Sequence, residues 1–149
     1  MKYEFEVPGK ITGKGRPRVN TMTCTAYTPT KTKEYEDLIK QYFIIKYRCA
    51  KPLEGRISVD IKAYFNVGKN TSKIQKQAML EGKLSPVKKP DIDNIAKIIL
   101  DALNKLAFKD DNQITKLYLE KIYAEEEKVS IVIEEYWKQG SLDYFVFLW

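Results

Sequence analysis

Apolar residues alternate with polar residues in several short stretches of the chain, which is the period of a half-buried β-strand. The alternation predicts strands over residues 3–7, 57–67, 114–123 and 128–136. It is clearest over 57–67, where every second residue is apolar. It is least regular over 114–123, so the pattern defines the register of that strand only loosely.

Two other stretches carry helix signals: in the first, apolar residues keep roughly to one side of a helix, and the second opens with a capping box. The first predicts a helix over residues 30–47, with Thr30 or Thr32 as its N-cap. The second predicts a shorter helix. Ser72 opens a capping box with the glutamine three positions later, and Gly82 ends the helix.

The strongest helical pattern covers residues 91–106. Its apolar stripe consists of Ile92, Ile95, Ile99, Ala102, Leu103 and Leu106. A chain of 149 residues with 44% hydrophobic residues can bury a core. Strands and helices together predict the α+β class, with one domain over 1–140 in which a mixed sheet packs with helices. An apolar tail over 141–149 either covers a dimer contact or folds back on its own core.

The charge is unevenly distributed along a basic chain. The formal net charge is +6, which suits either an anionic partner or simple solubility. Residues 1–90 hold 19 Lys and Arg against 8 Asp and Glu, a net of +11, and residues 91–149 hold 7 against 12, a net of −5. The sequence contains no histidine, which excludes Ser-His-Asp triads, Cys-His pairs and histidine-metal nucleases.

The chain contains two cysteines, Cys24 and Cys49. One pair is too few for a disulfide scaffold, and the zinc spacing CxxC is absent. We therefore expect reduced thiols in a cytoplasmic protein. The N-terminus has no apolar signal region, and the apolar run from Tyr144 to Trp149 is too short to span a bilayer. Neither a membrane nor a small-molecule cofactor is expected as a partner.

Acidic residues gather at two nearby places in this basic chain. Asp91 and Asp93 stand at the start of the third predicted helix, and Asp110 and Asp111 follow it. Their repulsion must be offset by a cation with oxygen ligands, such as Mg²⁺, or by neighbouring Lys and Arg. Lys97 follows Asp93 by one helical turn. Ordinary structural roles are also open: an N-cap at Asp91, a surface ion pair between Asp93 and Lys97, and turn positions for the other two.

Mg²⁺ in a basic protein indicates phosphate chemistry on a nucleic acid. Such an ion would polarise the phosphorus and activate an attacking water, while a lysine offsets the charge of the transition state. Tyr27 could stack on a base, although it can equally pack at the surface of the protein. The candidate phosphate contacts, which could instead form a solvated basic surface, are Lys14, Arg16, Arg18, Lys88 and Lys89.

One block of the chain reads P-D-I-D-N-I-A-K at 90–97, D-A-L at 101–103 and D-D-N-Q-I at 110–114. It resembles the RusA family of Holliday junction resolvases, whose pattern is roughly D-x-D-N-x-x-K, then D-A-L, then D-D-x-Q followed by V or I. The opening residues V-P-G-K, K-G-R-P-R and Y-T-P also look like members of this family. The resemblance covers about residues 3 to 136 and does not extend to the tail.

The resemblance implies a homodimeric, Mg²⁺-dependent endodeoxyribonuclease, with Mn²⁺ as a substitute. It would resolve four-way DNA junctions by symmetric cuts, in recombination and repair, in a bacterial cell or a phage. Asp91, Asp93 and Asp111 would be the metal-binding and catalytic carboxylates. Lys97 would be the catalytic lysine, and Asp110 is an additional candidate ligand. The alternatives are a broader nuclease of flaps and forks, or a DNA-structure-binding protein without catalysis.

Overall fold

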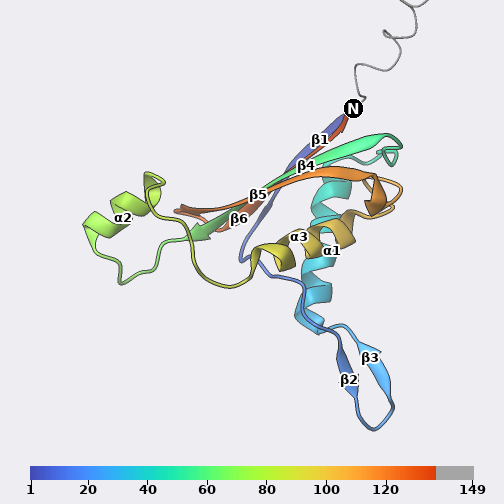
Figure 1. Ribbon diagram of the computed structural model, residues 1–149, viewed down its shortest axis with the longest axis horizontal. Coiled ribbons are helices and arrows are strands. Elements are labelled where there is room, and N and C mark those ends of the chain that lie inside the picture. The colour runs from blue at the N-terminus through green and yellow to red at the C-terminus, as the bar shows by residue number, and fades with distance from the viewer. Residues whose placement is uncertain (137–149) are drawn as a thin grey trace, which may run out of the picture.

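A four-stranded mixed sheet organises the computed structural model, which describes residues 1–136 (Figure 1). The strand order is β1-β6-β4-β5, and only β4 and β5 pair in parallel. This arrangement confirms the α+β class and all four predicted strands. The predicted tail, 141–149, lies outside the described residues. The strands are β1 (Lys2–Pro8), β4 (Arg56–Asn66), β5 (Ile114–Ala124) and β6 (Lys128–Tyr136).

Two helices lie in the long connection between the parallel strands β4 and β5. They are α2 (Lys73–Leu80) and α3 (Ile92–Leu103). Parallel neighbours need such a crossover, because the chain must return to the end of the sheet from which the first strand started. The crossover brings the start of α3, with its acidic residues, close to β5.

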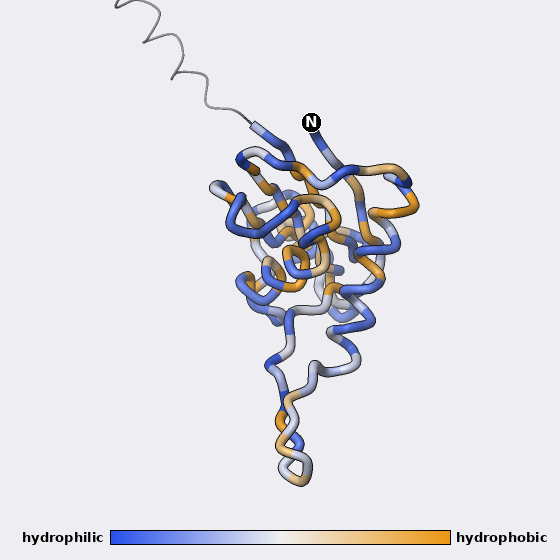
Figure 2. The backbone as a smooth tube through the Cα atoms, turned by 90° about the vertical axis from the view of Figure 1, so that its right-hand side faces the viewer, coloured by the Kyte–Doolittle hydropathy of each residue, from blue (hydrophilic) through white to orange (hydrophobic). Residues whose placement is uncertain are grey.

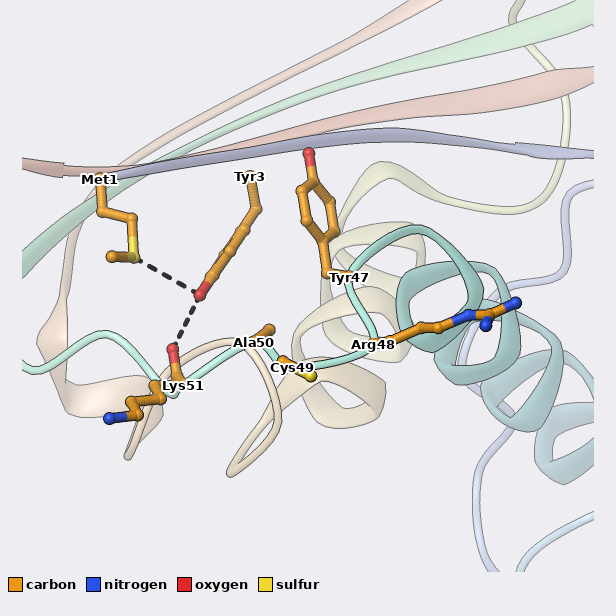
Figure 3. Close-up of a pocket in the computed structure, with 7 residues that line it drawn as sticks. All are labelled: Met1, Tyr3, Tyr47, Arg48, Cys49, Ala50 and Lys51. Carbon is orange, nitrogen blue, oxygen red and sulfur yellow. Dashed lines mark hydrogen bonds between the residues drawn. The ribbon is translucent and has the colours of Figure 1, made fainter.

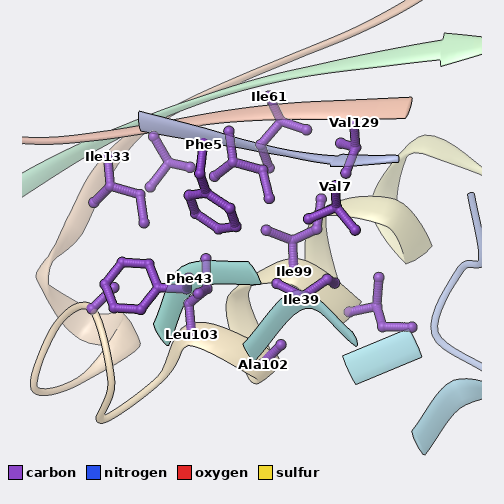
Figure 4. Close-up of a cluster of buried hydrophobic side chains, with 14 of the residues drawn as sticks. Phe5, Val7, Ile39, Phe43, Ile61, Ile99, Ala102, Leu103, Val129 and Ile133 are labelled. Atoms are coloured by element: carbon purple, nitrogen blue, oxygen red, sulfur yellow. The ribbon is translucent and has the colours of Figure 1, made fainter. Parts of the chain in front are cut away.

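One face of the sheet is buried under α1 (Thr30–Lys46) and α3. Every second residue of β4 from Ile57 to Phe65 is at most 3% exposed, which confirms the alternation seen in the sequence. Figure 4 shows Phe5 of β1 above Ile39 and Phe43 of α1. Burial of these large apolar side chains is the main source of stability of the fold.

The helix α3 is amphipathic and presents its polar side to solvent. Ile95, Ile99 and Leu103 are fully buried, as the stripe predicts. Ile92 is 49% exposed, so its predicted place in the stripe is wrong. The helix also ends at Leu103 rather than near residue 106, because Asn104 is extended and the next residue, a lysine, has a φ of 64°. A left-handed residue interrupts the regular helical hydrogen bonds.

The helix starts agree only partly with the predictions. Pro29 is the N-cap of α1 without a side-chain hydrogen bond, so the prediction that Thr30 or Thr32 caps this helix is wrong. The physical reason lies in Thr32, whose buried hydroxyl accepts the N–H of Gly15 instead. At α2, the predicted cap is confirmed, because Ser72 Oγ accepts the N–H of the glutamine three positions later.

A hairpin of two short strands, β2 (Arg18–Asn20) and β3 (Thr25–Tyr27), lies outside the main sheet. Figures 1 and 2 show it projecting from the molecule beyond the start of α1. The sequence pattern did not predict it, because all residues from 16 to 28 are exposed and no buried face imposes an alternation.

Within residues 1–136, none of the helices combines the length and the apolar character that crossing a membrane would require. Cys24 and Cys49 are both free and exposed, in agreement with the prediction of reduced thiols.

Candidate functional site

Asp91 stands at the N-cap position of α3 without using its side chain as a cap. Its backbone is extended, with φ −70° and ψ 153°, and its carboxylate accepts no capping hydrogen bond. Asp93 lies in the first turn of the helix, and both residues are exposed. The partial positive charge at a helix N-terminus favours carboxylates there. The two carboxylates are therefore placed together and remain accessible to a ligand.

Lys97 lies one turn further along α3 and is also exposed. Within the described part of the chain, no ion pair joins Lys97 to Asp93. The interpretation of these two residues as an ordinary surface ion pair therefore has no support in the geometry. Lys97 keeps its ammonium group exposed on the polar side of the helix.

A surface hollow of about 810 Å³ adjoins Asp91. It combines one carboxylate with several cations, and its wall joins the N-terminal loop, the start of α1 and the start of α3. A phosphate in this hollow would meet basic groups beside the carboxylate. The lining residues are Lys10, Ile11, Thr12, Gly13, Lys14, Arg16, Lys31, Lys89, Pro90, Asp91 and Asn94.

The N-terminal loop packs directly on the start of α3 through Gly13. A Cβ atom at this position would stand 2.6 Å from Pro90 Cβ and 3.0 Å from Asn94 Cβ. The next residue, Lys14, donates its backbone N–H to the carbonyl of Asn94 at 2.9 Å. A glycine is thus required by close approach, and the contact fixes the basic loop beside Asp91.

The side chain of Lys14 joins this loop to two helices. Its ammonium lies 2.5 Å from a carboxylate oxygen of Glu36 on α1 and 2.7 Å from one of Asp101 on α3. Burial disfavours the charged form, but the hydrogen bonds to Asp101 and Glu36 outweigh it and raise the pKa of Lys14. Because two carboxylates occupy this ammonium, the geometry favours a positioning role over the phosphate contact predicted from sequence.

The other predicted phosphate contacts differ in their surroundings. Lys88 Nζ donates to the Asn66 carbonyl at 3.0 Å and lies 5.4 Å from the ring centroid of Phe65. Its ammonium is therefore partly engaged by contacts within the chain, although the residue is exposed. Arg16 and Lys89 are exposed and line the hollow. Arg18 is exposed at the start of the hairpin, outside the hollow.

Three further lysines belong to this site but were missed in the sequence. Lys10 and Lys31 line the hollow. Lys121 on β5 donates its ammonium to the carbonyl of Pro90 at 3.1 Å and also to the carbonyl of Lys88. The Gly-rich loop could have signalled Lys10, since it belongs to the same basic run. Lys31 and Lys121 join the site through tertiary contacts alone.

Asp110 and Asp111 differ in what their side chains do. Asp110 Oδ1 accepts the N–H of Asn112 at 2.9 Å, and the Gln113 side chain accepts the N–H of Asp110, which completes a capping box. Asp110 thereby caps the short 3₁₀ helix Asp111–Gln113. Asp111 is exposed in the first position of that helix. Its carboxylate is the better placed of the two to act on a ligand.

Within one chain, Asp111 does not lie beside Asp91. The side chain of Gln113 binds the carbonyl oxygens of Leu53 and Gly55, whereas Lys121, eight residues further along β5, binds Pro90. Eight residues of β5 span about 26 Å and the 12 residues of α3 about 18 Å, so the two aspartates lie near opposite ends of both elements. Within residues 1–136, no group of three or more Asp, Glu, His or Cys side chains gathers to hold a metal ion.

A second hollow, of about 380 Å³, lies where the start of β1 meets the end of α1 (Figure 3). Tyr3 crosses it and donates its hydroxyl to the carbonyl of Lys51 at 2.8 Å. Its lining contains Cys49 and the side chain of Tyr47 but none of the predicted site residues. We assign it no part in the chemistry of the acidic block.

Comparison with known families decides what kind of protein carries this site. A family model described as Endodeoxyribonuclease RusA matches residues 8–134, which is most of the chain. This chain belongs to the RusA family. The resemblance recognised in the sequence is thereby confirmed. RusA proteins are endodeoxyribonucleases, and the family implies resolution of Holliday junctions.

The chain is also similar to a protein of Bacillus subtilis (strain 168). The two are 35% identical over 139 residues, which cover 89% of this chain and 95% of the relative. The relative carries the description "Uncharacterized protein YqaN". The similarity therefore extends over nearly the whole RusA domain but adds no activity of its own.

Proposed function

We propose that this RusA-family chain is a Mg²⁺-dependent endonuclease that resolves four-way DNA junctions by symmetric cuts. The observation that carries the proposal is Asp91, whose carboxylate does not cap α3 and lines the same hollow as Arg16 and Lys89. A carboxylate beside basic groups can hold a metal ion next to a bound phosphate. Membership of a nuclease family supports this chemistry.

The donor atoms at the start of α3 fit a magnesium ion. Mg²⁺ is usually bound by one or two carboxylates, together with waters and phosphate oxygens of the substrate. Asp91 and Asp93 are both exposed and supply that donor set. When bound, the ion would polarise the phosphoryl group and lower the pKa of an attacking water. Mn²⁺ prefers the same oxygen ligands and should substitute.

The chain's own cations would orient the DNA and offset charge. Arg16 and Lys89, exposed in the hollow, can bind backbone phosphates through charge-assisted hydrogen bonds. Lys97 projects from α3 one turn after Asp93. Its ammonium can offset the negative charge that builds up on the phosphoryl oxygens as the water attacks.

We also propose that the active form is a homodimer in which each site takes Asp111 from the partner subunit. Asp91 and Asp111 lie near opposite ends of α3 and of β5, which keeps Asp111 from the Asp91 of its own chain. A two-fold dimer would supply two such sites, and a four-way junction offers two near-equivalent strands to cut. This arrangement uses all three carboxylates of the family pattern.

The exposed edge of β5 is the surface that best supports such a dimer. β5 is the last strand of the sheet order, and Leu117 and Tyr118 on it are 43% and 62% exposed. Such edges readily pair with a second strand. Antiparallel pairing of two β5 edges near Leu117 would bring the start of β5 in one chain close to Lys121 of the other, beside Pro90 and Asp91.

The decisive experiment compares a labelled four-way junction with a flap and a linear duplex, each with and without Mg²⁺. We expect symmetric nicks in the junction alone, and only with the metal. Asp93→Asn should abolish cutting but leave junction binding unchanged or tighter, because it removes a metal ligand and one negative charge. Asp37→Asn, which removes the same charge from α1, is the matched control and should cut normally.

Two results would contradict the proposal in different ways. Equal cutting of the junction and the flap would show a broader nuclease of branched DNA. Binding without cutting in any divalent metal would show a DNA-structure-binding protein whose acidic residues only adjust the charge of the surface.

A further inference from the structure

The hairpin of β2 and β3 presents both of its faces to solvent. Every residue of the two strands is exposed, and the hairpin extends away from the sheet and the helices (Figures 1 and 2). An isolated hairpin of two strands is only marginally stable in water. A binding surface that covered this hairpin would therefore stabilise it.

The tip of the hairpin combines a defined turn with exposed apolar side chains. Asn20 Oδ1 accepts the N–H of Met22 at 2.9 Å, and the hydroxyl groups of Thr23 and Thr25 lie 2.7 Å apart. These contacts hold the turn in one shape. Met22 at the tip is 95% exposed, and Val19 on β2 is 63% exposed. An apolar tip on a polar protein surface suits a partner with an apolar interior.

The charge around the hairpin specifies an anionic partner. No Asp or Glu occurs between residues 7 and 33. A surface that carries only positive charge attracts a polyanion such as DNA. Its affinity for DNA would fall as the salt concentration rises, because binding neutralises phosphates. The basic residues of this segment are Lys10, Lys14, Arg16, Arg18, Lys31 and Lys33.

The hairpin is continuous with the hollow that contains Asp91. Arg16, just before β2, and Lys31, shortly after β3, both line this hollow. Met22 lies four residues beyond Arg18, so the hairpin reaches about 13 Å from its base. DNA bound with one phosphate in the hollow would therefore have a neighbouring base step within reach of the tip.

We propose that the hairpin is a wedge that inserts Met22, flanked by Val19, between unstacked bases at the branch point of the junction. This inference rests on the proposed function and assigns the recognition of branched DNA to residues 18–27. A two-stranded ribbon has the dimensions to enter a DNA groove, and apolar side chains such as methionine insert between base steps. Arg18 would bind a phosphate at the base of the wedge.

The first test measures base stacking with 2-aminopurine, whose fluorescence rises when it leaves the stack. The full-length chain binds a four-way junction with 2-aminopurine at the branch point, without divalent metal, so that cutting does not interfere. We expect a rise in fluorescence with the native chain. Met22→Ser should remove this rise and weaken junction binding about ten-fold, with linear duplex binding changed less than two-fold. Ile74→Ser, an equally simple change at an 83% exposed position of α2, is the matched control.

The two exposed cysteines provide a second test that leaves the tip intact. Cys24 lies in the turn of the hairpin, whereas Cys49 lies beyond the end of α1. The test uses a junction whose branch-point base carries an activated disulfide to a small thiol. The Cys24 thiolate should attack this disulfide, form a disulfide bond to the DNA and displace the small thiol. Cys49→Ser should therefore still form the cross-link, and Cys24→Ser should lose it.

Each outcome decides the proposal. Loss of the fluorescence rise in Met22→Ser, together with cross-linking at Cys24, supports it. A native chain that binds or cuts junctions, with Met22→Ser unchanged and no cross-link at Cys24, overturns the wedge and leaves the nuclease function standing. Dissociation of a dimer by Met22→Ser would also overturn it, because the hairpin would then contact a second copy of the chain. Failure of the native chain to bind any junction would overturn the wedge and the proposed function together.

Discussion

Asp110 and Asp111 are neighbours in the chain whose carboxylates have different surroundings. Asp110 caps a 3₁₀ helix, while Asp111 stays exposed. We expect Asp110→Ala to lower the free energy of unfolding by about 1 kcal/mol, the usual effect of losing a cap. Asp111→Asn should abolish junction cleavage and leave stability within about 0.5 kcal/mol, as for most exposed positions. Urea unfolding and a cleavage assay measure the two effects.

Asp110→Asn separates capping from metal binding, because asparagine caps helices as well as aspartate. It should preserve stability and most of the cleavage activity. If Asp111→Asn kept full activity and Asp110→Asn were inactive, the metal ligand would be Asp110 and not Asp111.

Among the elements, the contact between the N-terminal loop, α1 and α3 decides where the basic groups stand. Lys14 makes this contact through Glu36 on α1 and Asp101 on α3, and Gly13 allows the loop to touch Pro90. Both Glu36 and Asp101 would lose their cation if Lys14 were removed. The loop would then be held beside Asp91 by its backbone contacts alone.

Lys14→Met should lower the free energy of unfolding by about 1–2 kcal/mol at pH 7 to 9, because a partly buried carboxylate loses its partner. The pKa of Lys14 is raised above its usual value of 10.5. Its contribution is therefore complete below about pH 10.5 and disappears as the pH rises through the raised pKa. Urea unfolding at pH 7, 9 and 11 measures the difference between native and variant.

The exposed position Lys33 on α1 offers a matched control, since Lys33→Met removes the same charge. Its stability should stay close to that of the native chain at every pH. A Lys14→Met variant as stable as the native chain at pH 7 would show that the loop is held by its backbone contacts alone.

At the scale of the whole molecule, the central question is how three carboxylates meet. The crossover between β4 and β5 places Asp91 and Asp93 at one end of α3, and the return of the chain places Asp111 near the other. If two chains paired at their β5 edges, Asp111 of one chain would come close to Asp91 of the other. The proposed dimer therefore makes a prediction that a monomeric site does not share.

Mixing the inactive variants Asp91→Asn and Asp111→Asn should restore cleavage if the sites are shared. In a mixed dimer, the Asp111→Asn chain supplies Asp91 and the Asp91→Asn chain supplies Asp111, so one of the two sites is intact. After subunit exchange, each mixed dimer has one intact site where the native dimer has two. We therefore expect nicks in one strand of the junction. A gel assay of nicked junctions measures this recovery.

The control mixes Asp91→Asn with Asp93→Asn, two variants altered in the same arm of the site, which should not recover activity. No cutting in the first mixture would show that each site forms within one chain. Restored cutting in the control would contradict the assignment of Asp91 and Asp93 to the same arm, because it would require them to act from different chains.

Much of the architecture follows from local patterns. The strand β4 alternates because one of its faces is buried, and α3 has an apolar stripe because one side packs on the sheet. The β2–β3 hairpin escaped prediction because no buried face marks its residues. The cap of α1 was mispredicted because the hydroxyl of Thr32 binds the N–H of Gly15 from a distant loop.

The sequence by itself determined the acidic block, its spacing and the family, because these depend on residue types at fixed offsets. It also excluded imidazole chemistry, since the chain has no histidine. Only the tertiary structure decided that Lys14 binds Glu36 and Asp101, and that Asp111 does not lie beside Asp91 in one chain. These facts depend on contacts between segments distant in sequence, which the crossover topology creates and no local period encodes.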